Sequence, residues 1–375
     1  MGAPACCWRP CPLPEDLPLL RTLRRFVDRA LGLLGSQRAR ARSSATWTQE
    51  ELAPGPAAAR GADAAAGAGP ASRRPGSAGF DGAEFRLHKF RCAAGARDYK
   101  LFLPPARRAQ RLPLVVMLHG CKQTPDDFAL GTQMNAHAAQ SGCAVAYPSQ
   151  SRLYNPSGCW NWFRPSDQGR GHGEPAIIAG LTRELLATRP LDPERVYIAG
   201  LSAGGAMAAI LGAAYPELYA AVGVHSGVRQ GVAVGLASAL ATMRDGAGPI
   251  EAAHAETSPH RQPVIVFHGD ADTTVNPRNA VEVYLQSIPS SGDRVAVSGA
   301  TLQETIETRE APGGRRFTRT AWAQPDGRVI AELWVVHGAG HAWSGGDAGG
   351  SYTEPQGPNA SAEMLRFFLS HPRPR

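Results

Sequence analysis

The chain has 375 residues and a formal net charge of +7, with 43% hydrophobic and 19% charged residues, which provides for a sizeable core in one large domain or two. Its charge is uneven, because residues 1–79 carry 11 arginines against six acids, whereas residues 80–375 carry 28 basic and 26 acidic side chains. Most of the chain is thus nearly neutral and shows no basic patch interleaved with aromatics, which excludes nucleic acid as an expected partner. No apolar run approaches the ~18 residues of a membrane span, so stable membrane insertion is not expected.

The first 79 residues differ in character from the rest. Residues 1–18 have prolines and charges where the apolar part of a secretory signal would lie, so no signal peptide is recognised. Residues 17–34 place apolar side chains at helical spacing with arginines opposite, which predicts an amphipathic helix that packs on its own domain, with contact to a membrane surface as the alternative. Residues 36–79 are rich in Ala, Gly, Arg, Ser and Pro, as is typical of a linker or a disordered segment. We therefore predict an N-terminal segment, 1–79, and one folded domain, 80–375.

From residue 80 onward, strand patterns alternate with helix patterns. Residues 85–90 and 99–103 predict the two arms of an antiparallel pair. Continuous apolar runs, which indicate strands buried on both faces, follow at 114–118, 144–147, 195–199, 220–224, 264–267 and 333–336. Helical patterns lie at 174–188, 206–215 and 363–369. This alternation predicts an α/β fold with a mostly parallel sheet and helices on both faces.

The most informative motif is Gly-Leu-Ser-Ala-Gly at 200–204, between a predicted strand and a helix of small residues. A Gly-x-Ser-x-Gly motif in this context is typical of the nucleophile elbow of an α/β-hydrolase. Glycine tolerates the strained backbone, and its missing Cβ leaves room for the strand and the helix. Chance matches occur in a chain with 42 glycines, so the assignment of Ser202 as the nucleophile depends on its context.

A serine hydroxyl is a poor nucleophile and needs a base, which in turn needs an orienting acid. In α/β-hydrolases these residues follow the chain order Ser, acid, His. Asp272, in the loop after the next-to-last predicted strand, is our choice for the acid, and Asp270 is the alternative. His341, which follows the last predicted strand and a glycine-rich turn, is the predicted base. Its competitor His337 lies at the strand end, where a structural role is expected.

Acyl transfer also needs hydrogen-bond donors for the developing oxyanion. One predicted donor is the backbone N–H of Ala203, directly after the nucleophile. The second is expected from the loop after the 114–118 strand, which reads His-Gly-Cys, and we choose the N–H of Cys121. Cys159 is a possible disulfide partner of Cys121 in an oxidising compartment, but sequence spacing does not set connectivity, so the pairing stays a hypothesis.

Three aromatic residues crowd the segment 155–163, which is flanked by proline and glycine. These residues, Trp160, Trp162 and Phe163, suit an apolar binding wall near the site. A small cluster of core residues explains the same pattern equally well, and the sequence does not decide between the two.

Four motifs now stand in order: LHGCKQTPDDF at 118–128, CWNWF at 159–163, GLSAGGAM at 200–207 and GHAWSGG at 340–346. Together they resemble the esterase family of poly(3-hydroxybutyrate) depolymerases, over about residues 85–370. The resemblance implies a single-domain α/β-hydrolase that cleaves esters of short-chain hydroxyalkanoate polymers. Feruloyl and acetylxylan esterases are relatives of that family.

The resemblance also implies roles for individual residues. Ser202 corresponds to the nucleophile, Asp272 to the acid and His341 to the base, with the Cys121 region in the oxyanion hole. Exposed aromatics near the cleft are expected to hold an apolar polyester. The residues that we select for this role are Trp160, Trp162, Phe163 and Trp343.

This chemistry implies no metal and no organic cofactor, and the expected partner is a polyester or a small ester. The family resemblance implies an extracellular location, whereas the lack of a recognisable signal peptide leaves the cytoplasm as the alternative. No polymer-binding domain is recognised, so soluble esters and oligomers are as well supported as solid polymer. A carbohydrate esterase of the feruloyl or acetylxylan type is the nearest alternative. A catalytically silent binding protein on the same fold is a second one, against which the complete Ser, Asp and His set argues. The oligomeric state is unknown.

Overall fold

The computed structural model describes four stretches of the chain: residues 82–105, 111–247, 262–288 and 303–374. The amphipathic helix, the linker and the domain boundary expected within the first 80 residues lie outside them. Among the described residues, no helix combines the length and the apolar character that crossing a bilayer requires.

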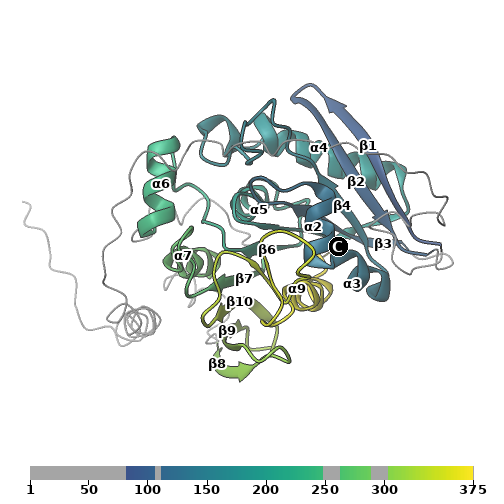
Figure 1. The fold of residues 1–375 in the computed structure, drawn as a ribbon. Coiled ribbons are helices and arrows are strands. Elements are labelled where there is room, and N and C mark those ends of the chain that lie inside the picture. Colours follow the sequence, from purple (N-terminus) through teal and green to yellow (C-terminus); the bar gives the residue numbers. More distant parts are fainter. Residues whose placement is uncertain (1–81, 106–110, 248–261, 289–302, 375) are drawn as a thin grey trace, which may run out of the picture. The chain divides into compact units, whose positions relative to one another are not determined.

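The centre of the described chain is a ten-stranded sheet with the order β1-β2-β4-β3-β5-β6-β7-β10-β9-β8 (Figure 1). Its strands are β1 (Glu84–Cys92), β2 (Gly95–Leu103), β3 (Leu112–Leu118), β4 (Ala144–Pro148), β5 (Leu191–Leu201), β6 (Ala221–His225), β7 (Val264–Gly269), β8 (Gln303–Glu310), β9 (Arg316–Ala323) and β10 (Val329–Val336). The strands from β4 to β10 in this order run parallel, and antiparallel pairs extend both edges. The predicted α/β fold with a mostly parallel sheet is therefore confirmed.

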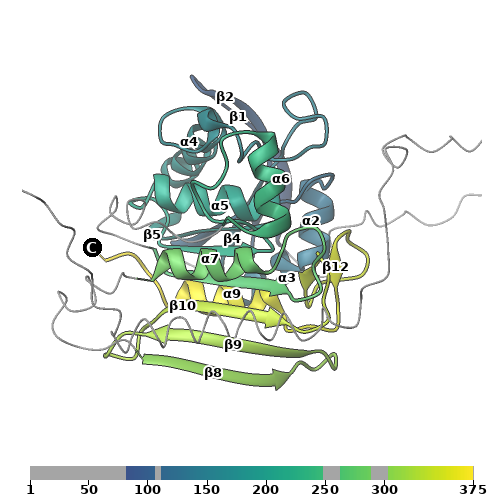
Figure 2. The ribbon, with the colours of Figure 1, turned by 90° about the vertical axis from the view of Figure 1, so that its left-hand side faces the viewer.

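Helices cover both faces of the sheet. They are α2 (Pro125–Thr132), α3 (Met134–Ser141), α4 (Gly173–Thr188), α5 (Ala203–Ala214), α6 (Leu236–Asp245), α7 (Arg278–Ser287) and α9 (Ala360–Leu369). Helices α3 and α9 pack side by side on one face, and α4 and α5 pack together on the other (Figures 1 and 2). A short parallel pair, β11 (Trp343–Ser344) with β12 (Thr353–Glu354), follows β10.

Small residues in the strands allow the helices to approach the sheet closely. A Cβ placed on Gly223 of β6 would lie 2.9 Å from the sulfur of Met364 in α9, on one face. The neighbouring Val222 faces the other side, where its Cγ2 would lie 2.4 Å from a Cβ placed on Gly212 of α5. Because alternate residues of a strand face opposite sides, β6 is packed on both faces, as its continuous apolar run predicts.

The sequence patterns missed the surface elements. Strands β8 and β9 form an antiparallel hairpin that extends the sheet beyond β10. Strand β8 reads Gln-Glu-Thr-Ile-Glu-Thr-Arg-Glu, and most of its residues are exposed. An edge strand with polar side chains on both faces lacks the apolar pattern from which strands are recognised. Helices α2, α3, α6 and α7 are short, with eight to ten residues each, and were not predicted either.

Candidate active site

The candidate nucleophile, Ser202, lies in a sharp turn between the end of β5 and the start of α5. Its backbone has φ 56° and ψ −118°, a conformation that non-glycine residues rarely adopt. Such a strained residue costs about 1–3 kcal/mol and persists only where its surroundings fix it. Here the Ser202 N–H donates to the carbonyl of His225, at the end of the neighbouring strand β6, over 2.8 Å. This turn is the strand-to-helix junction that the motif at 200–204 predicts.

The two glycines of the motif are required by close contacts. A Cβ on Gly200 would lie 2.4 Å from backbone atoms of Gly204. A Cβ on Gly204 would lie 2.0 Å from the carbonyl oxygen of Leu118, the last residue of β3. Since real Cβ atoms do not approach other atoms below about 3 Å, neither position admits a larger residue without backbone movement. The elbow is thereby packed against the strand that leads into the predicted oxyanion loop.

Asp272 and His341 meet at the carboxyl ends of neighbouring strands. Asp272 follows β7 and His341 follows β10, and these two strands are paired in parallel. The Nδ1–H of His341 donates to Oδ2 of Asp272 over 2.7 Å, while the N–H groups of Thr274 and Val275 both donate to Oδ1 over 2.9 Å. The Asp272 side chain is fully buried and that of His341 is 11% exposed. With Nδ1 engaged in this way, Nε2 of His341 is the ring nitrogen that is free to accept a proton.

The Asp272 carboxylate is held in its ionised form. Burial alone would raise its pKa, but hydrogen bonds from His268 and His341 outweigh burial and hold the pKa of Asp272 well below its usual range. Nε2 of His268 lies 3.2 Å from Oδ2 of Asp272 and 2.8 Å from the carbonyl oxygen of Val275. An ionised, buried carboxylate fixes the orientation of a neighbouring imidazole and stabilises its protonated form.

The two alternatives from the sequence, Asp270 and His337, are paired with each other. Nδ1 of His337 lies 2.8 Å from Oδ2 of Asp270, and the N–H of Gly338 donates to Oδ1 over 2.6 Å. Nε2 of His337 lies 2.9 Å from the hydroxyl of Thr318 in β9. Asp272 rather than Asp270 therefore contacts His341, and His337 sits in a separate hydrogen-bond network.

Among the described residues, the N–H groups of Cys121 and Ala203 donate no hydrogen bond. Three other N–H groups of the loop are engaged: Gly120 donates to Oε1 of Gln123 over 2.8 Å, Lys122 to the carbonyl of Ser157 over 2.9 Å, and Gln123 back to the carbonyl of Gly120 over 3.3 Å. Ala203 is the first residue of α5, where an N–H has no partner within the helix. Both predicted donors are thus available for an oxyanion.

The loop that carries Cys121 is held by buried polar contacts. The Nδ1–H of His119 donates to the carbonyl of Gly120 over 2.8 Å, and its Nε2 accepts the N–H of Gln150 over 3.1 Å. Burial lowers the pKa of His119 to about 4, so the ring is neutral and its two nitrogens keep these separate roles. The side chain of Gln123 also donates to the carbonyl of Ser351 over 2.9 Å. These contacts fix the direction of the loop's free N–H.

Cys121 and Cys159 form a disulfide, which links the oxyanion loop to the segment 155–163. That segment is anchored in turn by the buried carboxylate of Glu174, at the start of α4. Glu174 accepts the N–H of Asn161 over 2.7 Å and its side-chain amide over 2.8 Å, and forms an ion pair with Arg97 at 3.1 Å. The loop next to the candidate nucleophile is therefore fixed both covalently and by a buried charge.

The assignment of Trp160 and Trp343 to a substrate-binding wall is wrong. Both side chains are at most 1% exposed. The indole N–H of Trp160 donates to the carbonyl of His119 over 3.0 Å, and that of Trp343 donates to the hydroxyl of Ser361 over 3.1 Å. Both rings therefore belong to the core beside the site, where their indole N–H groups are satisfied by partners inside the fold.

The other two aromatics of that assignment lie nearer the surface. Trp162 is 6% exposed, and Phe163 is partly exposed and packs edge-on against it, with ring centroids 5.9 Å apart. Phe163 is therefore the residue of the predicted wall that keeps an accessible apolar surface.

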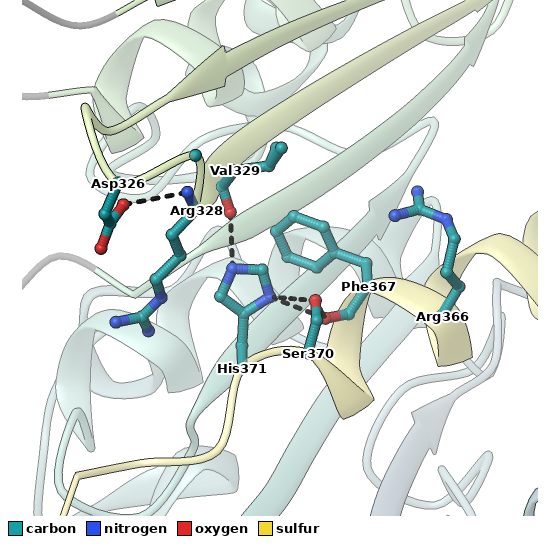
Figure 3. A pocket seen from close by; sticks show the side chains of 8 residues that line it. Asp326, Arg328, Val329, Arg366, Phe367, Ser370 and His371 are labelled. Carbon is teal, nitrogen blue, oxygen red and sulfur yellow. Dashed lines mark hydrogen bonds between the residues drawn. The ribbon is translucent and has the colours of Figure 1, made fainter.

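A cavity of about 430 Å³ lies at the opposite edge of the sheet. It is lined by Val329, where β10 begins, and by residues near the end of α9, including Arg366 and His371. Figure 3 shows that the two ring nitrogens of His371 face the carbonyl of Val329 and the Phe367–Ser370 turn. Because the candidate triad lies at the carboxyl ends of the strands, this cavity is separate from it.

Sequence reasoning missed several polar residues around the site. His225 is fully buried, its ring stacks on Trp343 with centroids 5.0 Å apart, and its Nε2 accepts the N–H of Ser344 over 3.0 Å. Burial holds the pKa of His225 well below its usual value, so the ring is neutral. Gln123 and Glu174 were also missed, although Gln123 lies within one of the recognised motifs. Among the described residues, no group of three or more His, Cys, Asp or Glu side chains is arranged to hold a metal ion.

Comparison with known proteins agrees with this geometry. Residues 97–311 match the family model described as Esterase PHB depolymerase. The chain is 31% identical over 251 residues to poly(3-hydroxyalkanoate) depolymerase C of Paucimonas lemoignei, covering 63% of this chain and 56% of that protein. It is 29% identical over 196 residues to feruloyl esterase B of Neurospora crassa, covering 48% and 66%. The chain thus spans between about half and two thirds of the length of these relatives.

Among solved structures, an acetyl xylan esterase from Aspergillus awamori superposes with a TM-score of 0.57 at 21% identity, covering 76% of this chain and 99% of that one. This likeness confirms the predicted α/β-hydrolase fold. Since the family model covers more than half of the chain, the protein is a member of the Esterase PHB depolymerase family.

Proposed function

We propose that this protein is a serine esterase that hydrolyses carboxylic ester bonds through an acyl-enzyme on Ser202. The observation that carries the proposal is the 2.7 Å hydrogen bond from His341 to the buried Asp272 carboxylate, at the same edge of the sheet as the strained elbow. A nucleophile, a base and an orienting acid, here on three loops at the carboxyl ends of parallel strands, are the minimum set for acyl transfer by serine.

The reaction follows from the roles that the geometry gives these groups. Ser202 attacks the ester carbonyl, and Nε2 of His341 accepts its proton, because Nδ1 already donates to Asp272. The oxyanion is stabilised by the N–H groups of Cys121 and Ala203, and loss of one such donor typically costs about 10²–10³ in rate. His341 then returns the proton to the leaving alcohol. Water repeats the attack on the acyl-enzyme and releases the acid.

The proposed substrates are polyesters of the poly(3-hydroxybutyrate) type or their oligomers. The similarity to a poly(3-hydroxyalkanoate) depolymerase, at 31% identity, supports this substrate class. The partly exposed Phe163, on the loop tied to Cys121 by the disulfide, offers an apolar contact for a short acyl chain. With Trp160 and Trp343 buried, however, the apolar wall is smaller than four aromatics would make it, which favours soluble oligomers over a solid polymer face.

A carbohydrate esterase is the second candidate. It is favoured by the similarity to feruloyl esterase B and by the superposition on an acetyl xylan esterase. Both candidates use the same three residues and differ only in the group that binds beside them. They are therefore separated by substrate rather than by mechanism.

One experiment tests both the mechanism and the substrate class. Wild type and Ser202→Ala are compared on p-nitrophenyl butyrate, hydroxybutyrate oligomers, polymer film, methyl ferulate and acetylated xylan, and both are treated with a fluorophosphonate probe. We expect wild type to be labelled and to turn over butyrate and oligomers, and the variant to do neither. Equal turnover by the two proteins would refute the mechanism. Turnover of ferulate or acetylxylan without butyrate would favour the carbohydrate esterase. A correctly folded wild type that is neither labelled nor active would indicate a silent binding protein.

We also propose that the protein acts outside the cytoplasm. The Cys121–Cys159 disulfide supports this location, because such bonds form and persist in oxidising compartments. Fractionation of the native host with a thiol-labelling assay tests it. Protein recovered from the cytoplasm with both thiols reduced would contradict the proposal.

A further inference from the structure

Two Asp–His pairs join the same two loops, and only one of them contains the proposed acid and base. Asp270 and Asp272 lie on the loop after β7, while His337 and His341 lie on the loop after β10. The Asp272–His341 distance is 2.7 Å and the Asp270–His337 distance is 2.8 Å. The second pair therefore forms a second bridge between these two loops. We call the loop after β7, which carries Asp272, the acid loop, and the loop after β10, which carries His341, the base loop.

The base loop is one that needs such a bridge. His341 follows Gly338, which has φ 72°, and Gly340, around which a Cβ would meet nothing within 4 Å. Glycine backbone loses more conformational freedom on ordering than that of any other residue, so this loop is costly to hold in one conformation. Packing fixes it at Ala339, whose carbonyl oxygen accepts the N–H of Ala271 over 3.0 Å.

Asp270 holds the part of the base loop between the end of β10 and Ala339. Its Oδ1 accepts the N–H of Gly338 over 2.6 Å, and its Oδ2 accepts the Nδ1–H of His337. Both oxygens of one carboxylate are thus used on two consecutive residues of the base loop. A charged acceptor makes each of these hydrogen bonds about twice as strong as a neutral one.

The His337 ring is fixed from its other side as well. Its Nε2 lies 2.9 Å from the hydroxyl of Thr318 in β9, and that hydroxyl lies 3.0 Å from the hydroxyl of Thr308 in β8. The carbonyl of His337 accepts a hydrogen bond from Nη1 of Arg315 over 3.2 Å. The side chains of His337 and Asp270 are 27% and 13% exposed, so the pair lies at the rim of the sheet. The bridge is thereby anchored in the outer hairpin.

We propose that Asp270 and His337 are positioning residues that hold the base loop so that His341 stays aligned with Asp272 and Ser202. The proposal rests on the esterase function proposed above, because it assigns His341 the role of base. Neither residue touches the reacting atoms. Their effect reaches the reaction through the orientation of the His341 ring.

The test uses Asp270→Asn and His337→Gln in the full chain, with Asp326→Asn as the matched control. Asp326 is exposed and accepts only the N–H of Arg328 among the described residues, so its substitution makes the same charge change away from the loop. We expect Asp270→Asn and His337→Gln, the rim variants, each to lower kcat on p-nitrophenyl butyrate by about 10-fold to 100-fold with little change in KM. A small misplacement of a reacting group causes a rate loss of this size. The double variant should lose no more than the worse single variant, because both remove one bridge.

Two further measurements distinguish a positioning role from a purely structural one. The low-field proton resonance of the His341–Asp272 hydrogen bond should shift or broaden in Asp270→Asn, and the acid limb of the pH profile of kcat/KM should move. The proposal is overturned if the rim variants have a lower melting temperature but unchanged kcat, resonance and pH profile, or if Asp326→Asn has the same effects. The resonance is measured without substrate. It therefore tests the positioning even if wild type proves inactive, which would refute the proposed function instead.

Discussion

Gly204, in the first turn of the elbow helix, lies so close to Leu118 that a Cβ on the glycine would stand 2.0 Å from the leucine carbonyl oxygen. Leu118 ends β3, and the predicted oxyanion loop begins at the next residue. The contact therefore sets the distance between Ser202 and the N–H of Cys121, which must both reach one ester carbonyl. Gly204 is thus needed for the close contact between the elbow after β5 and the end of β3, as well as for the turn in which it lies.

Gly204→Ala is expected to lower both stability and activity. The new methyl group would force the α5 N-terminus away from β3, and overpacking of this kind typically costs about 1–3 kcal/mol. Thermal unfolding and kcat on p-nitrophenyl butyrate measure the two effects. Gly340→Ala is the control for stability, because a Cβ there meets nothing within 4 Å. A Gly204→Ala protein with the wild-type melting temperature would contradict the packing described here.

Asp272→Asn is expected to lower kcat by about 10⁴, the loss seen when the orienting acid of a serine triad becomes an amide. Circular dichroism should show an intact fold, since asparagine has nearly the same size. Asp326→Asn provides the control for a lost carboxylate at an exposed position. Retention of more than about a tenth of the wild-type kcat would remove Asp272 from the role of orienting acid.

The same substitution should alter the pH dependence of stability. A folded-state pKa held below the ordinary aspartate value of about 3.9 stabilises the fold above that pH, and the stabilisation is lost as the pH falls below it. The pKa of Asp272 is lowered in this way, because hydrogen bonds from His268 and His341 outweigh the effect of burial. The free energy of unfolding of wild type should therefore fall more steeply than that of Asp272→Asn between about pH 5 and pH 3. Parallel urea titrations across this range test the sign, and equal slopes would contradict it.

Reduction of the Cys121–Cys159 disulfide should destabilise the protein and slow the reaction. The bond closes a loop over a sequence separation of 38 residues, for which the chain-entropy model gives about 4 kcal/mol at most. Urea unfolding with and without reductant measures this, and kcat should fall more than KM changes because the Cys121 N–H loses its anchor. The double variant Cys121→Ser/Cys159→Ser is the control and should not respond to reductant. A reductant effect of equal size in that variant would point to another thiol, such as the buried Cys143.

The parts of the site that depend on local sequence could be predicted. The elbow requires glycine at 200 and 204 because a Cβ at either position would clash with backbone atoms of the elbow itself or of the adjacent strand β3. The motif alone therefore indicates the tight turn. The order of Ser202, Asp272 and His341 follows from the succession of parallel strands, whose carboxyl ends share one edge. Buried strands were likewise predicted from their continuous apolar runs.

What could not be predicted depends on how distant segments are aligned. The pairing of Asp270 with His337 is set by the register of β7 against β10, and nothing in either loop specifies it. Trp160 lies in a loop and Trp343 in the short strand β11, and both rings are buried because their indole N–H groups donate to partners that are distant in sequence, the carbonyl of His119 and the hydroxyl of Ser361. The role of Glu174 depends on its contacts with Arg97 in β2 and with Asn161 in the segment 155–163, which a pattern along helix α4 does not reveal.

Glu174→Gln is expected to destabilise the protein by about 3–5 kcal/mol, because it leaves the guanidinium of Arg97 buried without a counter-charge. The Arg97 side chain is 3% exposed, and its ion pair with Glu174 lies beside the hydrogen bonds that hold Asn161. Arg97→Met/Glu174→Gln removes the unpaired charge as well and should recover part of the lost stability. Urea unfolding of wild type, both single variants and the double variant gives the coupling free energy. Additive losses would show that the two charges do not depend on each other, and that the loop bearing Cys159 is held by its remaining contacts.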